Sequence, residues 1–413
     1  MNKKLLGLAL VMVMISGNAM ATSIEDKIDI LQQEIEELKA QAAASEAKNH
    51  ASGIKGLQGF VDNTTIGGYG EIVYNNFKGS RSKNGEALND TTDVRRAVLY
   101  IGHRFTDRLT FHSELEVEHA VSSADDQGEF EVEQAYLDYK FNDVASVKAG
   151  LFLMPLGLLN ENHEPPRFFG VNRNEVETRI IPTTYREVGI GLFGGFENGF
   201  GYDVGITTGF DSGKIDEPAL GVRSGHQEGQ LAHSEDLQLY ASAKYTGIPG
   251  LLLGAGFTTG NTGQDGASSA VLKNVDARLT LGEVHARYET HGFDLSALYA
   301  RGKLNDARKV TQAIGNAAPD DYYGWYMQVA YHAYKTSEID IAPFIRFERF
   351  DVGQQENAAD GSFFPRDVTA RDRITTVGVN IYPHPDVVVK ADYQHYQNDD
   401  AHSSFNLGLG YQF

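Results

Sequence analysis

Apolar and polar residues alternate with a period of two along most of this sequence. In the clearest run, residues 109–119, Phe111 and Val117 share one face and Glu114 and Glu116 share the other. This pattern predicts a β-strand with one apolar and one polar face. About sixteen such runs follow one another, a number typical of a transmembrane β-barrel. They begin near Ile66, Asp93, Arg108, Glu131, Ser146, Glu187, Phe200, Asp236, Leu251, Asp276, Phe293, Tyr322, Glu338, Asp372, Asp386 and Ser403.

The connections between these runs are of two kinds. Short turns, such as 142–143 and 383–385, alternate with long polar loops, such as 211–235 and 351–371. This asymmetry is typical of barrels that have turns at one end and loops at the other. We therefore expect an all-β transmembrane barrel of about 16 antiparallel strands over residues 63–413.

The N-terminus indicates export. It carries Lys3 and Lys4, an apolar run over 5–15 and the small-residue pattern Asn-Ala-Met-Ala at 18–21, which predict a signal peptide over 1–21. No later segment reaches the roughly 18 consecutive apolar residues of a spanning helix. An exported chain of this kind crosses a membrane as a closed barrel. The absence of cysteine suits an oxidising periplasm. We expect a location in the outer membrane of a Gram-negative bacterium.

The segment before the predicted barrel has a different spacing of apolar residues. Within residues 22–42, apolar residues recur at alternating steps of four and three, at Ile24, Ile28, Leu31, Ile35, Leu38 and Ala42. This spacing predicts a short coiled-coil helix that joins subunits in the periplasm. Because the seam covers only about three heptads, a single amphipathic helix lying on a neighbour is the alternative. Residues 43–62 are small and polar, as expected of a linker.

One connection differs from the others. The segment 154–186 mixes apolar residues, such as Leu156 and Phe168, with charges. Loops of this length are usually functional or disordered, and a merely solvated loop would not need apolar anchors. We therefore expect it to fold against the inner wall and narrow the pore. Its charged residues are Glu161, Glu164, Arg167, Arg173, Glu175, Glu177, Arg179 and Arg186.

Strand parity places seven basic residues on the inward face, which we call the basic ladder: Arg96, Arg104, Lys140, Lys148, Lys244, Arg346 and Lys390. The same parity places six acids inside: Glu114, Glu116, Glu118, Asp138, Glu348 and Asp392. Rings of Arg and Lys are a recurring device of anion pores. His112, Glu114 and Glu116 share one face and can in principle hold a divalent cation. A polar lumen explains the same residues, so we expect no metal and no cofactor.

The central segment resembles the phosphate-selective porin O/P family in three stretches, AYLDYKF, KAGLFLMPLGLLNE and REVGIGLFGG. The resemblance implies a sixteen-stranded outer-membrane barrel, assembled as a homotrimer, with a periplasmic coiled coil and an inward loop. Anion-selective members carry a ladder of arginines. The alternating C-terminus, with Tyr411 and the terminal Phe413, is similar to the signal that the barrel assembly machinery reads in porins.

These observations predict a porin that passes small hydrophilic solutes, with anions such as phosphate preferred. The chain has 36 basic and 56 acidic residues and a net charge of −20, which argues against nucleic acid. Much of the acid lies in the predicted helix and loops, beyond a screening length of about 8 Å from the pore. A general or cation-preferring porin is one alternative, and a structural or adhesive barrel is another. Expected partners are outer-membrane lipid, lipopolysaccharide and small ionic solutes.

An enzyme is not expected. The G-x-G-x-x-G pattern at 189–194 lacks the helix that a dinucleotide site needs, so a glycine-rich strand explains it. No Ser and His constellation suggests a hydrolase.

Overall fold

The computed structural model describes residues 39, 59–121 and 128–413. The chain divides into two compact units, Met1–Asn63 and Thr64–Phe413. The expected signal peptide (1–21) and most of the expected coiled coil (22–42) and linker (43–62) lie outside the described residues. In the first unit, Lys39 and residues 59–63 are helical. Within the described ranges, no helix is both long and apolar enough to cross a membrane.

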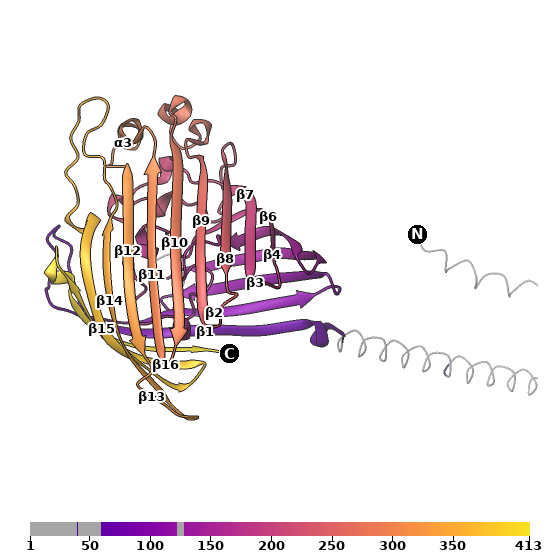
Figure 1. Cartoon of the computed structure of the whole chain (residues 1–413). Helices are drawn as coiled ribbons and strands as arrows, with labels where there is room; N and C mark the ends of the chain where they lie inside the picture. Colours follow the sequence, from indigo (N-terminus) through magenta and orange to yellow (C-terminus); the bar gives the residue numbers. More distant parts are fainter. Residues whose placement is uncertain (1–38, 40–58, 122–127) are drawn as a thin grey trace, which may run out of the picture. The chain divides into compact units, whose positions relative to one another are not determined.

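The second unit is a closed barrel. Its seventeen strands form one antiparallel sheet in chain order, and β1 also pairs with β17, from Tyr69 opposite Gln412 to Phe77 opposite Ser404 (Figure 1). The strands are β1 (Thr64–Phe77), β2 (Thr91–Arg104), β3 (Leu109–Glu118), β4 (Phe130–Asn142), β5 (Ala145–Leu153), β6 (Arg186–Gly195), β7 (Phe200–Thr208), β8 (Leu237–Tyr245), β9 (Leu251–Asn261), β10 (Arg278–Thr290), β11 (Phe293–Leu304), β12 (Asp321–Tyr331), β13 (Tyr334–Lys335), β14 (Asp340–Asp351), β15 (Arg371–His384), β16 (Val387–Tyr396) and β17 (Ser404–Gln412).

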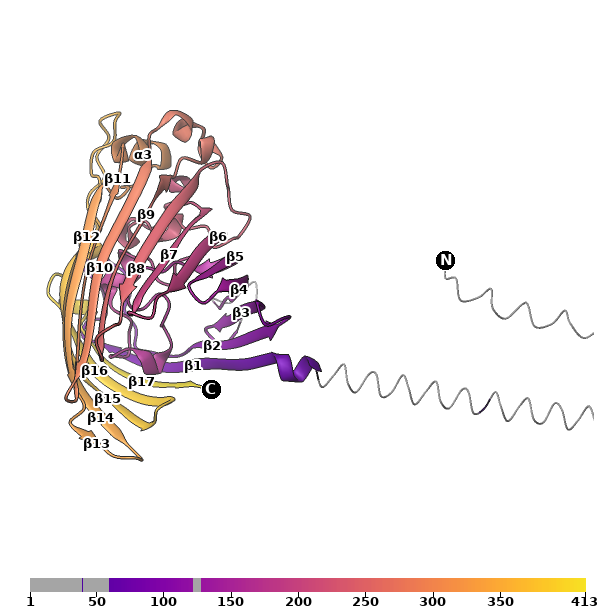
Figure 2. The ribbon, with the colours of Figure 1, turned by 45° about the vertical axis from the view of Figure 1, so that its right-hand side comes forward.

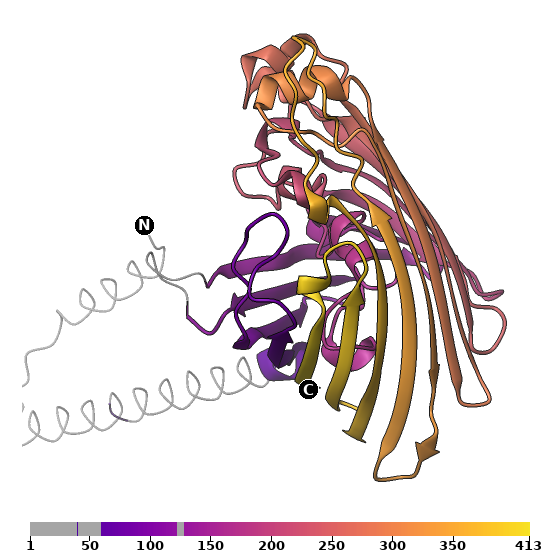
Figure 3. The same cartoon turned by 90° about the vertical axis from the view of Figure 1, so that its left-hand side faces the viewer.

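The predicted number of wall strands is confirmed. β13 has two residues and pairs only with the start of β14, so sixteen strands make up the closed wall. The glycine-rich pattern at 189–194 lies within β6, as expected of a strand. Figure 2 follows these strands around the wall, and Figure 3 shows the yellow C-terminal strands beside the indigo N-terminal ones.

The two ends of the barrel differ, and we call them the turn end and the loop end. At the turn end, β10 and β11 are joined by His291 and Gly292 alone, and both have positive φ (48° and 82°), as a two-residue hairpin turn requires. At the loop end, the connections include 209–236 and 352–370. Short helices in the long connections are η1 (Pro165–Arg167), α2 (Glu175–Arg179), η2 (Ser212–Lys214), η3 (Pro218–Leu220), η4 (Arg223–Gly225), η5 (Gln264–Gly266), η6 (Ala270–Asn274), α3 (Ala307–Ile314), η7 (Val368–Ala370) and η8 (Asp400–His402).

Alternation along the strands separates the two faces of the wall. In β8, Leu237 and Leu239 are exposed, whereas Gln238 and Tyr240 are buried. The exposed positions are apolar and the buried ones are largely polar, which is the inverse of a soluble sandwich. The apolar side chains therefore lie on the outer face of the wall, and the side chains that contact the inward loop come from the inner face.

Candidate pore constriction

The connection between β5 and β6, residues 154–185, folds into the barrel, and we call it the constriction loop. Met154, Leu156, Ile180 and Ile181 are at most 1% exposed and belong to one apolar cluster with wall residues such as Leu281. Because this cluster includes wall strands, the loop lies on the inner face. The inward loop that the apolar anchors predicted is therefore present (Figure 3).

The tip of the loop is held by the opposite part of the wall. Four side chains of β14, β15 and β16 bond four successive backbone groups of the loop. These bonds are Asn380 Nδ2 to Phe168 O (3.1 Å), Arg346 Nη1 to Phe169 O (3.0 Å), Lys390 Nζ to Gly170 O (2.8 Å) and Val171 N to Asp392 Oδ2 (2.6 Å). The loop therefore crosses the lumen, and two members of the basic ladder hold it in place.

Several charges of the inner wall are paired with one another. Arg96 contacts Glu71 at 2.9 Å and Glu116 at 3.3 Å. Lys148 donates to Asp203 at 2.6 Å. Arg346 and Glu348 make a similar buried pair at 2.8 Å. In these three pairs the basic charge is compensated locally, so Arg96, Lys148 and Arg346 present little net charge to the lumen.

The other three members of the ladder lie near the turn end. Arg104 is the last residue of β2, and Lys140 and Lys244 lie within two residues of the ends of β4 and β8. All three are exposed, and Lys140 pairs with Asp143 at 2.8 Å. The predicted ladder is therefore divided between four buried residues and three exposed residues near the turn end.

Two β-bulges turn additional charges inward. The pairing of β1 with β2 passes from Glu71 opposite Arg96 to Ile72 opposite Val94, which leaves Arg95 as the extra residue. The pairing of β3 with β4 leaves Glu133 as an extra residue in the same way. A bulge interrupts the alternation of faces, so Arg95 and Arg96 both reach the interior. Strand parity alone could not identify Arg95 or Glu133.

A pocket of about 450 Å³ lies between the constriction loop and the loop end, and we call it the arginine pocket. Its basic residues are Arg95, Arg96, Arg173, Arg179 and Arg223, and its acidic residues are Glu71, Glu118 and Glu175. Five arginines against three glutamates leave a net positive lining. Arg223 comes from the connection between β7 and β8, one of the long polar loops expected from the sequence.

Three of these arginines are held by neutral acceptors. Arg95 donates to Asn172 Oδ1 at 2.9 Å, and Arg223 donates to the carbonyl of Thr183 at 2.5 Å. Arg173 makes only a 3.5 Å contact with a backbone carbonyl. Within the part of the chain that the structure describes, none of the three has a carboxylate within 4.0 Å. Burial lowers the pKa of Arg223, but a guanidinium stays charged in proteins.

The predicted acidic residues of the loop have distinct environments. Glu161 is exposed and Glu164 is half-buried. Glu175 pairs with Arg179. Glu177 is fully buried and accepts from the backbone N–H groups of residues 158 and 159 at 2.9 and 2.7 Å. Burial raises the pKa of Glu177, and its bonds indicate that it shapes the loop rather than contacts a solute.

The remaining basic residues of the loop lie on both sides of its tip. Arg167 is exposed and lines a pocket of about 400 Å³ toward the turn end, together with Arg287, Asp294 and Asp340. That pocket contains both signs of charge. Arg186 is the first residue of β6 and pairs with Glu131 at 2.6 Å. The arginine pocket is therefore the more basic of the two spaces.

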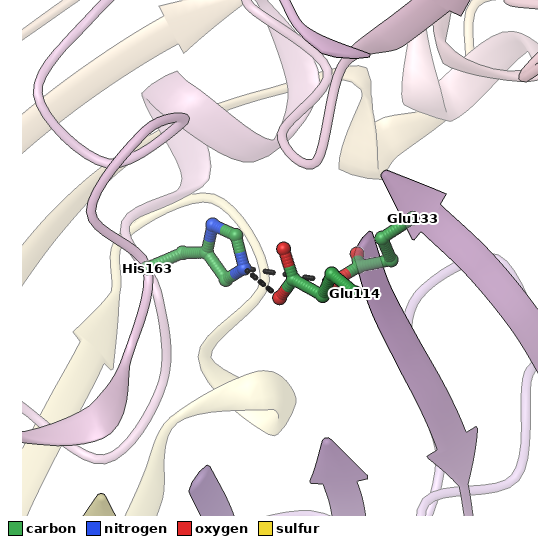
Figure 4. Close-up of side chains that lie close together, drawn as sticks. All are labelled: Glu114, Glu133 and His163. Atoms are coloured by element: carbon green, nitrogen blue, oxygen red, sulfur yellow. Dashed lines mark hydrogen bonds and ion pairs between the residues drawn. The ribbon is translucent and has the colours of Figure 1, made fainter. Parts of the chain in front are cut away.

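A buried cluster joins the loop to β3 and β4, and we call Glu114, Glu133 and His163 the His163 cluster (Figure 4). His163 Nε2 lies 3.3 Å from Glu114 Oε1 and 3.6 Å from Glu133 Oε2. Burial alone would lower the pKa of His163, but the two carboxylates raise that pKa to about 9. His112, which shares a strand face with Glu114, instead stacks on Tyr136. No periodicity in the loop pointed to His163.

The predicted assembly residues lie at the seam between β17 and β1. Phe413 is 73% exposed, and its backbone exchanges two hydrogen bonds with Gly68, at 2.9 and 3.0 Å. Tyr411 is also exposed. Recognition of these residues by the assembly machinery stays a prediction.

Comparisons with known proteins agree with this architecture. An uncharacterized protein of Aquifex aeolicus is 31% identical over 369 residues, which are 84% of this chain and 80% of that protein. Among solved structures, OmpF of Salmonella typhi in complex with daunomycin has a TM-score of 0.56 at 12% identity and covers 85% of this chain and 98% of its own. The outer-membrane channel DcaP of Acinetobacter baumannii has a TM-score of 0.52 at 12% identity, with 85% and 97% covered.

The structural matches show the barrel fold alone, because their sequence identity is low. The sequence match is more specific. The family model described as phosphate-selective porin O and P matches residues 65–407, which is nearly the whole barrel. The chain therefore belongs to the phosphate-selective porin O and P family of outer-membrane channels.

Proposed function

We propose that this channel passes small hydrophilic solutes by passive diffusion and mildly prefers anions such as phosphate. The observation that carries the proposal is the arginine pocket, in which Arg95, Arg173 and Arg223 have no carboxylate partner among the described residues. A solute that enters from the loop end meets this pocket before it reaches the tip of the loop.

The net charge of the chain does not decide selectivity. Charges farther than about 8 Å from an ion are largely screened at physiological salt, whereas narrow clefts with low-dielectric walls concentrate the field of their lining. The basic ladder contributes less than its sequence suggests, since Arg96, Lys148 and Arg346 are paired with acids. Arg95, Arg173 and Arg223, which have no carboxylate partner among the described residues, supply the positive field instead.

The chemistry of arginine favours oxyanions in particular. A guanidinium offers five donors in a planar fork that matches phosphate and carboxylate groups. Arg95 and Arg173 are close neighbours of the loop residue Asn172 in the same pocket. Two or three guanidinium groups around one space can therefore bind a doubly charged phosphate better than chloride.

The test is the zero-current potential of the purified protein in a planar bilayer under a KCl gradient. We expect a preference for chloride over potassium, and a reversal in the Arg173→Glu/Arg223→Glu variant. A unit charge about 5 Å from the path of an ion changes its energy by about 0.8 kcal/mol in a water-like medium, roughly fourfold in partitioning. Each Arg→Glu change alters the local charge by two units, so the double variant alters it by four. Its effect on the zero-current potential should therefore be large.

The matched control is Arg308→Glu, which makes the same change at an exposed position of α3 outside the arginine pocket. It should leave the potential near that of the unchanged protein. A clear cation preference in the unchanged protein would favour a general or cation-preferring porin. Absence of conductance would favour a structural or adhesive barrel in which the constriction loop acts as a plug.

Assembly forms the second part of the proposal. We propose a homotrimer in which residues 22–42 associate as a coiled coil in the periplasm. The exposed apolar residues of the strands, such as Ile190, Ile206 and Met327, would contact outer-membrane lipid below the lipopolysaccharide layer. Tyr411 and Phe413 would be read by the barrel assembly machinery.

A further inference from the structure

We propose that the His163 cluster binds a divalent transition-metal cation, which ties the constriction loop to the barrel wall. The three side chains come from different elements: Glu114 from β3, Glu133 from the bulge of β4 and His163 from the constriction loop. Each is at most 3% exposed. In Figure 4 the imidazole ring and both carboxylates point toward one another.

The separations within the cluster match the size of a small tetrahedral ion. Two ligand atoms that each lie 2.0–2.1 Å from a tetrahedral zinc ion are about 3.3 Å apart. His163 Nε2 lies 3.3 Å from the Glu114 oxygen and 3.6 Å from the Glu133 oxygen. One ligand atom from each residue lies within 4.8 Å of the others. One oxygen of each carboxylate is therefore within reach of an ion bound to Nε2 once the side chains adjust.

The atoms that would not bind the ion are all held by hydrogen bonds. His163 Nδ1 lies 3.0 Å from the backbone carbonyl of Asn160, and because a carbonyl only accepts, Nδ1 is the donor. Gln134 Nε2 donates to Glu114 Oε2 at 2.7 Å, and Thr184 Oγ1 donates to Glu133 Oε1 at 2.6 Å. Partners of this kind orient the ligands of metal sites. In the neutral ring, Nε2 then has a free lone pair for the ion.

One oxygen of the cluster lacks a partner. Glu133 is 0% exposed, and its Oε2 atom has no hydrogen-bond partner in the described structure. Burying a carboxylate oxygen without a partner is costly. A divalent cation supplies the missing contact, and its two positive charges balance the two carboxylates while the imidazole stays neutral.

A protonated His163 is the rival explanation. An imidazolium has a single Nε2–H group, which can serve Glu114 at 3.3 Å but leaves Glu133 Oε2 at 3.6 Å, beyond hydrogen-bond range. Arg186 is a second basic residue near Glu133, but its Nη1 lies 3.8 Å from the other oxygen, Oε1. A proton therefore satisfies one carboxylate, whereas a metal ion satisfies both.

The ligand set indicates the class of ion. One imidazole and two carboxylates suit zinc, manganese and ferrous iron, whereas calcium and magnesium prefer oxygen ligands alone. The separation of about 3.3 Å expected for a tetrahedral ion favours zinc. The protein supplies three ligands, so a water molecule would complete the coordination. The ion would restrain residues 160–163, and its binding does not depend on the solute preference of the channel.

The experiment measures zinc binding by untagged, full-length protein in detergent after removal of metal with a chelator. We expect one zinc ion per chain by elemental analysis and, in a competition titration, at least about 100-fold weaker binding by His163→Gln and by Glu133→Gln. Zinc should also protect the constriction loop of the unchanged protein from protease. Conductance is not the readout, so a failure of the selectivity proposal does not affect this test.

The matched control is His112→Gln, which changes a histidine of the same strand as Glu114 that stacks on Tyr136 and should leave zinc binding unchanged. Folding of every variant is checked by heat-modifiable mobility on gels. If His163→Gln does not insert, Gln134→Leu keeps all three ligands and should still weaken binding about 10- to 100-fold. Equal zinc affinity in the unchanged protein and in Glu133→Gln, or no stoichiometric zinc, would overturn the proposal in favour of an imidazolium ion pair.

Discussion

The ion pair between Glu175 and Arg179 determines how much of the charge of one arginine reaches the arginine pocket. The carboxylate of Glu175 lies within hydrogen-bond distance of Arg179 and of the hydroxyl of Tyr396 at 3.1 Å. His402 lies nearby, and the backbone N–H of Glu175 donates to Glu348. Burial acts to raise the pKa of Glu175, but Arg179, Tyr396 and His402 outweigh it and leave that pKa below its ordinary value of 4.5.

The lowered pKa of Glu175 determines how anion preference changes with pH. A carboxylate whose pKa is depressed in the folded protein stays charged at neutral pH, and its stabilising pairing is lost only as the pH falls through the depressed pKa. Below that point Arg179 is no longer compensated. We therefore expect anion preference to rise in the acidic range below about pH 4.5, and Glu175→Gln to show the raised preference already at pH 7.

The measurement is the zero-current potential as a function of pH for the unchanged protein and for Glu175→Gln. Glu161→Gln removes an exposed carboxylate of the same loop that does not line the arginine pocket, and it should retain the acid-dependent change. If Glu175→Gln keeps the full pH dependence of the unchanged protein, another group controls it.

At the scale of single elements, the tip of the constriction loop depends on one glycine. Gly170 has φ of 87°, and its carbonyl accepts from Lys390. Residues with a Cβ atom adopt this region at a cost of about 1 kcal/mol. We expect Gly170→Ala to lower the free energy of unfolding by about that amount and to move the carbonyl away from Lys390, which should raise single-channel conductance and its noise.

Gly361 offers a matched control, because it has the same φ of 87° but lies in open surroundings in the connection between β14 and β15. Gly361→Ala should carry a similar backbone cost without any change in conductance. The two variants are compared by thermal unfolding and by bilayer recording. Equal conductance in both would mean that the tip of the loop does not limit the flow of ions.

The elements differ in how far the sequence predicts them. Strands with one face toward lipid must alternate, so their number and order follow from periodicity. The constriction loop was predicted from its length and its apolar anchors. Arg95 and Glu133 were missed because a bulge interrupts the alternation and leaves no mark in the pattern. Arg223 and His163 were missed because loops have no period, and only the folded chain brings them near the wall.

At the scale of the whole molecule, closure of the barrel depends on the two ends of the sheet. β17 pairs with β1, and the backbone of Phe413 extends this pairing to Gly68. Deletion of Phe413 removes two hydrogen bonds at the seam together with the terminal aromatic ring. We expect less inserted, heat-modifiable protein in the outer membrane, with export to the periplasm unchanged.

Phe413→Tyr keeps both the aromatic ring and the backbone bonds, so it should insert normally. Quantitative gels of outer-membrane and periplasmic fractions provide the comparison. Normal amounts of inserted protein after deletion would argue that neither the seam bonds nor the terminal ring is needed for assembly.

Attachment of the loop tip through backbone atoms affects how the sequence of the constriction loop can change. The hydrogen bonds from wall side chains of β14, β15 and β16 to residues 168–171 all involve backbone atoms of the loop. Every amino acid presents the same carbonyl, and all but proline present the same N–H group. The side chain of Arg173 can therefore be exchanged while the polar attachment of the loop tip persists. The barrel wall and the pore-lining side chain at position 173 can therefore change independently. One barrel can in this way carry loops with different solute preferences.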